Sequence, residues 1–194
     1  MEEKNDQILI DDYFKGNEKS LEMLIKKYLK QVYNFAYSYF GEKNIASDVT
    51  QEIFVKMWKN LRKFNRKKDF KVWLFTIAKN TIFDFLGKKK QIPFSNFEFE
   101  NYDENQINLI DNLEENELLP EKIFEKIETK EKINSAIKKL TPIYREVILF
   151  YYYHNFSLKE ISEILNEPVN TVKSRHLRAL QKLKVLLDAD LDIE

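Results

Sequence analysis

The chain has 194 residues, which is enough for one large or two small domains, and its 32 Lys and Arg residues balance its 32 Asp and Glu residues to a formal net charge of zero. It has no cysteine, which excludes a disulfide framework and a thiolate metal site. Its three scattered glycines cannot build a glycine-rich nucleotide loop, and its long stretches of helical periodicity predict an all-α protein.

The N-terminal residues and the hydropathy of the chain give no sign of export. The opening sequence MEEKNDQ is acidic and lacks the apolar region of a signal peptide. No apolar run is long enough to cross a bilayer. We therefore expect a cytoplasmic protein without membrane insertion.

The neutral net charge hides segments of strongly biased charge. Lys and Arg dominate residues 48–90 and stand without acidic neighbours in residues 168–187, whereas residues 95–120 carry Asp and Glu with no Lys or Arg. Two basic blocks around an acidic segment suggest two anion-binding bodies and a connector. We accordingly predict two small helical domains joined by an acidic linker, with the domains at residues 6–90 and 121–187 and the linker at 91–120.

The first domain is predicted to contain helices at residues 6–15, 20–40, 48–61 and 70–86. The second of these helices ends at Gly41, because glycine is a natural residue just after a helix C-terminus. Ser47 or Asp48 opens the third helix. A polar basic loop precedes the fourth helix, which ends at Gly87.

The third predicted helix has two different faces. Positions i, i+3, i+4 and i+7 lie on one side of a helix, which gives a polar, partly acidic face formed by Asp48, Gln51, Glu52 and Val55. The next face is suited to packing inward and is formed by Phe54, Met57, Trp58 and Leu61. A polar face beside an apolar one can dock a partner helix, although a solvated surface would also explain Asp48 and Glu52. We expect a change at Trp58 to harm folding above all.

The loop before the fourth helix places cations between two aromatic residues, in the sequence FNRKKDF at residues 64–70. Cations hold the phosphates of a nucleic-acid strand, and an aromatic side chain or an adjoining pocket can receive an unstacked base. The alternative is an ordinary lysine-rich loop whose ends are anchored by Phe64 and Phe70. On the fourth helix, polar residues recur at helical spacing at Lys71, Lys79, Asn80 and Asp84.

The linker and the start of the second domain have weaker patterns. Residues 91–120 combine scattered aromatics with many Asn and acidic residues and show no clean period, which predicts an extended or weakly ordered connector. A helix is predicted near residues 123–140. Thr141 and Pro142 then provide the cap and first turn of a helix that runs to about His154.

Residues 157–187 have the pattern of a helix-turn-helix. Ser157 is a good N-cap, and Glu160 completes a capping box. Asn166-Glu167-Pro168 breaks the helix, because proline disfavours helix in the residue before it. Asn170 can cap a second helix, whose apolar stripe is formed by Val172, Ala179, Leu180, Leu183 and Leu187.

The other face of this second helix carries Lys173, Ser174, Arg175 and Arg178. A short capped helix, a tight turn and a helix studded with cations form the arrangement that places side chains in the major groove of DNA. A two-helix corner with a solvated charged face is the plainer alternative. His176 lies on the apolar stripe, four residues after Val172, and we expect it to be a half-buried packing residue and not a ligand.

Both domains resemble the extracytoplasmic-function (ECF) subfamily of bacterial sigma-70 factors. In the first domain, the stretches DVTQEIFVKMWKNL and FKVWLFTIAKNTIFDFL match the family pattern at Asp48, Gln51, Glu52, Phe54, Trp58, Trp73, Leu74, Ile77, Ala78, Asn80 and Asp84. The second domain matches at Leu140-Thr141-Pro142, Arg145, Ile161, Ile164, Leu165, residues 171–175, Arg178, Ala179 and Leu183. The resemblance covers roughly residues 10–187 in the family's order and spacing.

The resemblance implies an alternative sigma factor that binds core RNA polymerase, reads the minus-ten and minus-thirty-five promoter elements and helps to melt DNA. It implies that the clamp coiled coil of the polymerase's largest subunit is bound by Asp48, Gln51, Glu52 and Val55. The minus-ten DNA contacts would come from Phe64, Asn65, Arg66, Lys67, Lys68, Lys71, Lys79 and Asn80. The minus-thirty-five DNA contacts would come from Asn170, Thr171, Lys173, Ser174, Arg175 and Arg178.

The resemblance also implies further partners and exposes two departures from the family pattern. An anti-sigma factor is a usual partner, and the acidic linker resembles the connector that lies along the polymerase's RNA path, with a solubilising tether as the alternative. Gly87 stands where the family commonly has a basic residue, a charge that Lys88–Lys90 could replace. At His176-Leu177 the family more often has an apolar residue followed by a polar one.

Two other classes of function compete with this interpretation. A hydrolase or transferase lacks candidates, because the chain has two histidines and no thiol, so we expect no enzymatic activity and no cofactor. A stand-alone helix-turn-helix transcription regulator, whose first domain senses a signal, would bind duplex DNA without polymerase. The pattern at residues 48–86 speaks against it, because a sensor domain has no reason to carry that pattern.

Overall fold

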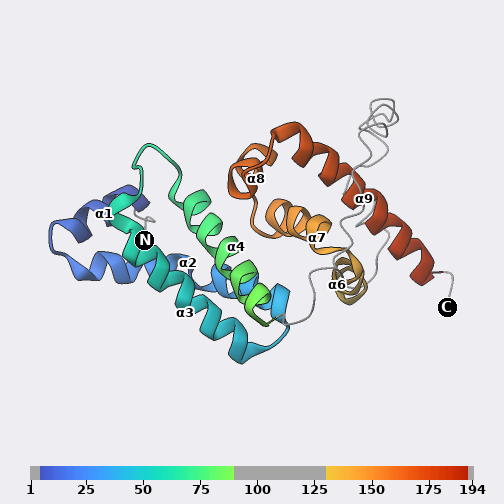
Figure 1. The fold of residues 1–194 in the computed structure, drawn as a ribbon, viewed down its shortest axis with the longest axis horizontal. Helices are drawn as coiled ribbons and strands as arrows, with labels where there is room; N and C mark the ends of the chain where they lie inside the picture. Colours follow the sequence, from blue (N-terminus) through green and yellow to red (C-terminus); the bar gives the residue numbers. More distant parts are fainter. Residues whose placement is uncertain (1–4, 90–129, 192–194) are drawn as a thin grey trace. The chain divides into compact units, whose positions relative to one another are not determined.

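The computed structural model describes the backbone of residues 5–89 and 130–191 (Figure 1). Within these ranges all regular secondary structure is helical, as the sequence predicted. The chain divides into two units, Met1–Asn96 and Phe97–Glu194. The predicted linker at residues 91–120 lies outside the described residues. No helix in the described ranges is both long and apolar enough to cross a membrane.

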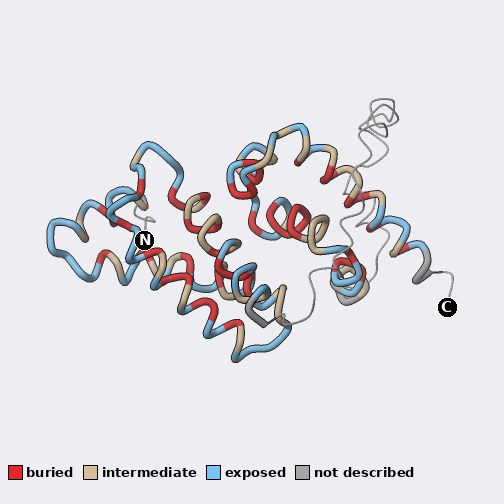
Figure 2. Tube along the Cα trace, in the orientation of Figure 1, coloured by how far each residue is buried: buried red, intermediate tan, exposed pale blue. Residues whose placement is uncertain are grey.

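The N-terminal unit packs its helices around a shared apolar core (Figure 2). Its elements are α1 (Asp6–Phe14), α2 (Glu18–Phe40), α3 (Lys43–Asn60), a short 3-10 turn η1 (Leu61–Lys63) and α4 (Phe70–Lys89). Phe35 of α2 and Phe75 of α4 are fully buried, and their ring centroids lie 5.5 Å apart. Ile53 and Met57 add the apolar stripe of α3 to this core.

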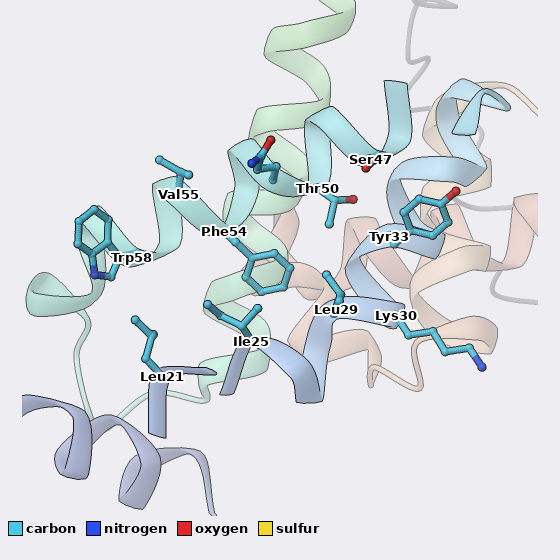
Figure 3. Close-up of a pocket in the computed structure, with 11 residues that line it drawn as sticks. Leu21, Ile25, Leu29, Lys30, Tyr33, Ser47, Thr50, Phe54, Val55 and Trp58 are labelled. Carbon is cyan, nitrogen blue, oxygen red and sulfur yellow. The ribbon is translucent and has the colours of Figure 1, made fainter. Parts of the chain in front are cut away.

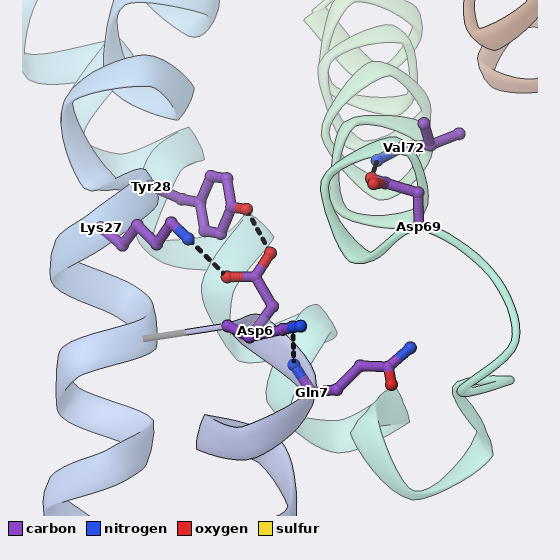
Figure 4. A network of polar contacts seen from close by, with 7 residues as sticks. Asp6, Gln7, Lys27, Tyr28, Asp69 and Val72 are labelled. Carbon is purple, nitrogen blue, oxygen red and sulfur yellow. Dashed lines mark hydrogen bonds and ion pairs between the residues drawn. The ribbon is translucent and has the colours of Figure 1, made fainter. Parts of the chain in front are cut away.

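Polar contacts fix the N-terminal ends of α1 and α4 (Figure 4). The Asp6 carboxylate accepts a hydrogen bond from the Tyr28 hydroxyl at 2.5 Å and pairs with the Lys27 ammonium at 2.9 Å, which holds α1 against α2. The Asp69 carboxylate accepts a hydrogen bond from the Val72 amide at 2.9 Å and caps α4.

Helix α3 begins earlier, and α4 ends later, than the sequence predicted. Gly41 ends α2 with a φ of 66°, as expected, but α3 starts at Lys43 and not at Ser47 or Asp48. Ala46 is fully buried, so packing extends α3 toward its N-terminus without a side-chain cap. Gly87 lacks the positive φ that ends a helix, and α4 continues through it to Lys89.

The described part of the C-terminal unit contains α6 (Lys130–Lys139), α7 (Pro142–Ile148), a π-helical turn η5 (Leu149–Tyr153), α8 (Leu158–Leu165) and α9 (Val169–Leu191). Thr141 occupies the N-cap position of α7 with Pro142 in its first turn, as predicted. Arg145 donates to the carbonyls of Ile137 at 3.2 Å and Leu140 at 2.9 Å, which joins the end of α6 to α7. Residues 121–129 of the predicted preceding helix lie outside the described ranges.

Helices α8 and α9 form the predicted helix-turn-helix. The Ser157 hydroxyl accepts from the Glu160 amide at 3.3 Å, and the Glu160 carboxylate accepts from the Ser157 amide at 2.7 Å, which completes the capping box. Asn166 ends α8 in the left-handed conformation with a φ of 57°. Because α9 begins at Val169, Asn170 lies inside its first turn, and the prediction that Asn170 is the N-cap is wrong.

Candidate functional site

The polar face predicted on α3 lies on the surface. Asp48, Gln51 and Val55 are exposed, and Glu52 is partly exposed. The Lys56 ammonium lies 3.1 Å from the Glu52 carboxylate and 3.4 Å from the Asp84 carboxylate of α4. Asp84 therefore has a structural partner that links α4 to α3, although ion pairs this exposed contribute little free energy.

A groove of about 750 Å³ lies beside this face, between α2 and α3 (Figure 3). Its lining is mostly apolar and comes from both helices: Leu21, Ile25, Leu29, Lys30 and Tyr33 of α2, and Ser47, Thr50, Gln51, Phe54, Val55 and Trp58 of α3. Gln51 and Val55 belong both to the groove and to the polar face of α3. The two features therefore form one continuous surface.

The expectation that Trp58 packs inward is wrong. Its side chain is 49% exposed, and its indole N–H donates to the Tyr13 hydroxyl of α1 at 2.8 Å. Sequence reasoning also missed the α2 wall of the groove, although Leu21, Ile25 and Leu29 recur every four residues. This stripe runs beside the buried stripe of α2. Two apolar stripes on one helix indicate that α2 has apolar surface in addition to the face that packs into the core.

The loop after α3 separates its aromatic residues from its cations. Phe64 is 5% exposed and packs on Phe70 and Trp73, with ring centroids 5.6 and 4.9 Å away. Phe64 therefore anchors the loop, as the plainer alternative proposed, and its position does not suit the expected base contact. Lys67 and Lys68 are exposed, as is Asn65, whose side-chain oxygen accepts from the Lys67 amide at 3.0 Å.

Helix α1 holds Arg66, a contact that nothing in the sequence signalled. The Arg66 guanidinium pairs with the Asp11 carboxylate and lies 5.2 Å from the centroid of the Phe14 ring. The Gln7 side-chain amide donates to the Arg66 carbonyl. The basic loop is thus held by contacts from α1, whose Gln7 lies 59 residues before Arg66 in the chain.

The predicted polar residues of α4 are accessible to different degrees. Asn80 is exposed, and Lys71 and Lys79 are partly exposed. The Lys79 ammonium lies 5.6 Å from the centroid of the Phe83 ring. The side chains of Lys88–Lys90 lie outside the described residues, so their suggested replacement of a charge at Gly87 stays a prediction.

The first turns of α9 present most of the predicted minus-thirty-five residues. Lys173 and Asn170 are exposed, and Thr171, Ser174 and Arg178 are partly exposed. The capping box of α8 and the left-handed turn before Pro168 set where these turns begin. Hydroxyl, amide and cationic groups of this kind donate hydrogen bonds to base edges and phosphates.

Arg175 differs from the rest of this predicted set because it is buried, with 4% of its surface exposed. Its guanidinium lies 2.6 Å from the Glu167 carboxylate and 3.6 Å from the Glu146 carboxylate. The expected reach to a base would remove the guanidinium from both carboxylates. Its position supports a role inside the domain and not at the DNA surface.

His176 is also buried, more completely than expected, with 8% of its surface exposed. Its ring stacks on Tyr152 at 5.7 Å and lies 4.7 Å from Tyr151. Burial lowers the pKa of His176 from its usual 6.5 to about 4 and raises the pKa of Tyr152. His176 is therefore a neutral packing residue at neutral pH.

The described residues offer surfaces for binding. No group of three or more His, Asp or Glu side chains within residues 5–89 and 130–191 is arranged to hold a metal ion. The apolar groove suits a helix, because helices dock in such grooves through side chains spaced three and four residues apart. The cations after α3 and on α9 suit a nucleic-acid backbone.

Comparison with known proteins connects both units to one family. The family model "Sigma-70 region 2" matches residues 24–92, and the model "Sigma-70, region 4" matches residues 130–183. The chain is 32% identical over 170 residues to the ECF RNA polymerase sigma factor SigW of Bacillus subtilis (strain 168), covering 88% of this chain and 90% of that protein. It is 28% identical over 187 residues to the ECF RNA polymerase sigma-E factor of Escherichia coli (strain K12), covering 94% of each chain.

Two solved structures share the fold of this chain. CnrH, solved in complex with the cytosolic domain of CnrY, matches with a TM-score of 0.66 and 25% identity, over 95% of this chain and 98% of CnrH. The sigma factor RpoE of Bartonella quintana, solved in complex with the anti-sigma factor NepR, shares the fold with a TM-score of 0.63 and 22% identity, over 89% of this chain and 99% of RpoE.

These findings decide between the interpretations of the first domain. A region 2 match over residues 24–92 contradicts a stand-alone regulator with a sensor domain there. The second match adds region 4 at the helix-turn-helix. The chain therefore belongs to the ECF subfamily of sigma-70 factors, noncatalytic proteins that direct promoter-specific transcription initiation by RNA polymerase.

Proposed function

We propose that this sigma factor uses one surface to bind core RNA polymerase and two surfaces to recognise the promoter, and that it works in the cytoplasm. The α2–α3 surface binds core polymerase, the loop after α3 and helix α4 read and melt the minus-ten element, and α9 reads the minus-thirty-five element. The observation that carries the proposal is that polar and cationic residues of all three segments remain outside the core, at Gln51, Lys68 and Lys173. The acidic linker at residues 91–120 connects the two DNA-reading domains.

The polymerase surface joins the polar face of α3 to the adjoining groove. Asp48, Gln51, Glu52 and Val55 supply the polar face, with Val55 41% exposed at its border with the groove. A helix of the polymerase clamp would lay its apolar side in the groove and over Trp58, and the rim carboxylates would steer the basic residues of that helix. Trp58 is the aromatic anchor of this surface, because a half-exposed indole has much area left to bury.

The minus-ten surface consists of the cations after α3 and the polar positions of α4. Asn65, Arg66, Lys67 and Lys68 contact the strand backbone, and Lys71, Lys79 and Asn80 extend the path along α4. Extruding a base from a duplex costs a few kcal/mol, so pocket and phosphate contacts must offset that cost. Phe64 stays in the core and stabilises the loop from beneath.

The minus-thirty-five surface is the exposed side of the first turns of α9. Lys173 reaches base edges or phosphates, Asn170, Thr171 and Ser174 donate to either, and Arg178 contacts a phosphate. Arg175 is not part of this surface, because its guanidinium lies against two buried or partly buried carboxylates.

An anti-sigma factor completes the proposed partners. CnrH was solved with CnrY, and the Bartonella quintana factor with the anti-sigma factor NepR. An inhibitor of this chain that occupied the α2–α3 groove would exclude core polymerase by direct competition for that groove.

The test of the proposal is transcription from a promoter library by core polymerase, with and without the protein. Val55→Asp should weaken polymerase binding by about tenfold or more, because a carboxylate would be buried unpaired against an apolar partner. The same change at Val185, which is 67% exposed on α9, is the matched control and should have no effect. Equal affinity of both variants for core polymerase would refute the proposal that the α2–α3 surface binds polymerase.

A second pair of variants tests α9. Lys173→Ala should reduce promoter discrimination by a factor that corresponds to about 1–3 kcal/mol if Lys173 contacts a base, or lower the salt dependence of binding if it contacts a phosphate. Lys184→Ala, at an exposed position further along α9, is the control. Absence of protein-dependent initiation on every template would refute the proposed function as a whole.

A further inference from the structure

The guanidinium of Arg175 joins three segments of the C-terminal unit. It lies on α9, and it contacts Glu146 of α7 and Glu167 of the turn between α8 and α9. Arg175 and Glu146 are 4% and 5% exposed, whereas the Glu167 side chain is 32% exposed. We call these three residues the arginine cluster.

Stability alone does not explain an arginine at this position. Removing charges from water is costly, and apolar side chains of similar volume often replace a buried ion pair with no loss of stability. An ionic cluster does restrict position, because a buried guanidinium that moves away from its carboxylates becomes an unpaired charge in the interior. The cluster therefore restricts how α9 is rotated against α7 and the turn.

Rotation about the α9 axis decides which side chains face outward. Successive residues of an α-helix are about 100° apart, so Lys173 lies about 160° around the helix from Arg175. Holding Arg175 inside consequently directs Lys173 away from the domain, and Lys173 is exposed. A rotation of α9 by about 100°, the angle between successive residues, would bring Ser174 toward the interior. It would also change which side chains face a DNA groove.

We propose that Arg175 is a positioning residue, which acts with Glu146 and Glu167 to fix the orientation in which α9 presents Lys173 and Ser174 to DNA. This role rests on the proposed function of α9 as the minus-thirty-five reader. Arg175 contacts no base or phosphate, and its contribution to recognition passes through the orientation of its neighbours.

The experiment replaces the buried pair as a unit in the full-length protein, with Glu146→Leu combined with Arg175→Met. The readout is the ratio of transcripts made by core polymerase from a promoter chosen in the library and from the same promoter with a scrambled minus-thirty-five element. We expect this ratio to fall by at least about tenfold while the thermal melt of the C-terminal unit stays near that of the parent. Leu183→Met, a conservative change in the buried stripe of α9, is the control and should alter neither quantity.

A second variant keeps the test decisive if the double variant does not fold. Glu167→Gln removes the charge of one arm of the cluster at a partly exposed position, and we expect a severalfold loss of discrimination in a protein that still folds. Full discrimination in folded variants, while Lys173→Ala still loses it, would overturn the positioning role and leave α9 as the DNA reader. No effect of Lys173→Ala would overturn the proposed function of α9 and, with it, this inference.

Discussion

Replacing His176 with leucine should make the C-terminal unit more resistant to mild acid. The imidazole is 8% exposed, packs against Tyr151 and Tyr152, and its Nε2 has no hydrogen-bond partner among the described residues. Burial holds the pKa of His176 at about 4, below its usual 6.5. Between pH 6.5 and pH 4 the folded unit therefore keeps this ring neutral, whereas the unfolded chain protonates it.

The sign and size of the effect follow from these two pKa values. Below pH 6.5 the unfolded state binds a proton that the folded state rejects, so stability is intact above pH 6.5 and is lost progressively as the pH falls toward 4. Between pH 7 and pH 5 the parent should lose about 2 kcal/mol on account of this group, and about 3 kcal/mol once the pH is below 4. His176→Leu should lose none of this.

Chemical denaturation of parent and variant at pH 7, 6 and 5 measures the difference, since the carboxylates titrate equally in both. Ile164→Val, a change at a buried apolar position of α8, is the matched control: it should lower stability by about 1 kcal/mol at every pH. Proton NMR gives an independent check, because the chain has two histidines and the resonance absent from the variant belongs to His176. A stability gap that stays constant from pH 7 to pH 5 would refute the reasoning.

The remaining predictions concern local structure. Ser157→Ala should lower the free energy of unfolding by about 1 kcal/mol, measured by a thermal melt, because it removes the hydroxyl of the capping box. Gly41→Ala should destabilise by about 1 kcal/mol because its φ is +66°, whereas Gly87→Ala, inside α4, should stabilise by up to about 1 kcal/mol; thermal melts that shift in the same direction would contradict one of the two predictions. Trp58→Phe should cost at most about 1 kcal/mol of stability, since it loses a hydrogen bond to Tyr13, yet weaken polymerase binding in a pull-down with core enzyme.

Local signals in the sequence predicted local structure well. The capping box at Ser157 and the glycine at residue 41 define helix ends through their own chemistry, and both are confirmed. The start of α3 could not be found in the same way. It depends on Ala46 packing into the core, a tertiary effect that leaves no capping signal behind.

Helical periodicity was enough to predict which candidate-site residues of α9 are buried. Arg175 lies three residues after Val172 and four before Ala179, so it occupies the same helical stripe as these buried residues. This spacing alone predicts that Arg175 is buried. The chemistry of arginine favoured DNA and obscured that position. The contacts of Arg66 with α1 depend on how distant segments meet, which no local pattern records.

Burial also separates residues that residue type alone would group together. Phe64 and Trp58 flank the same turn, yet Phe64 is 5% exposed and Trp58 is 49% exposed. Helix α3 buries Ile53 and Met57 in the core and leaves the indole of Trp58 in the lining of the apolar groove. By the same logic, Arg175 is held in the domain while Lys173, two residues earlier, is left to the solvent. Candidate binding residues of this protein are therefore found by first setting aside the residues that are buried in the core. The chemistry of the residues that remain exposed is considered only after that step.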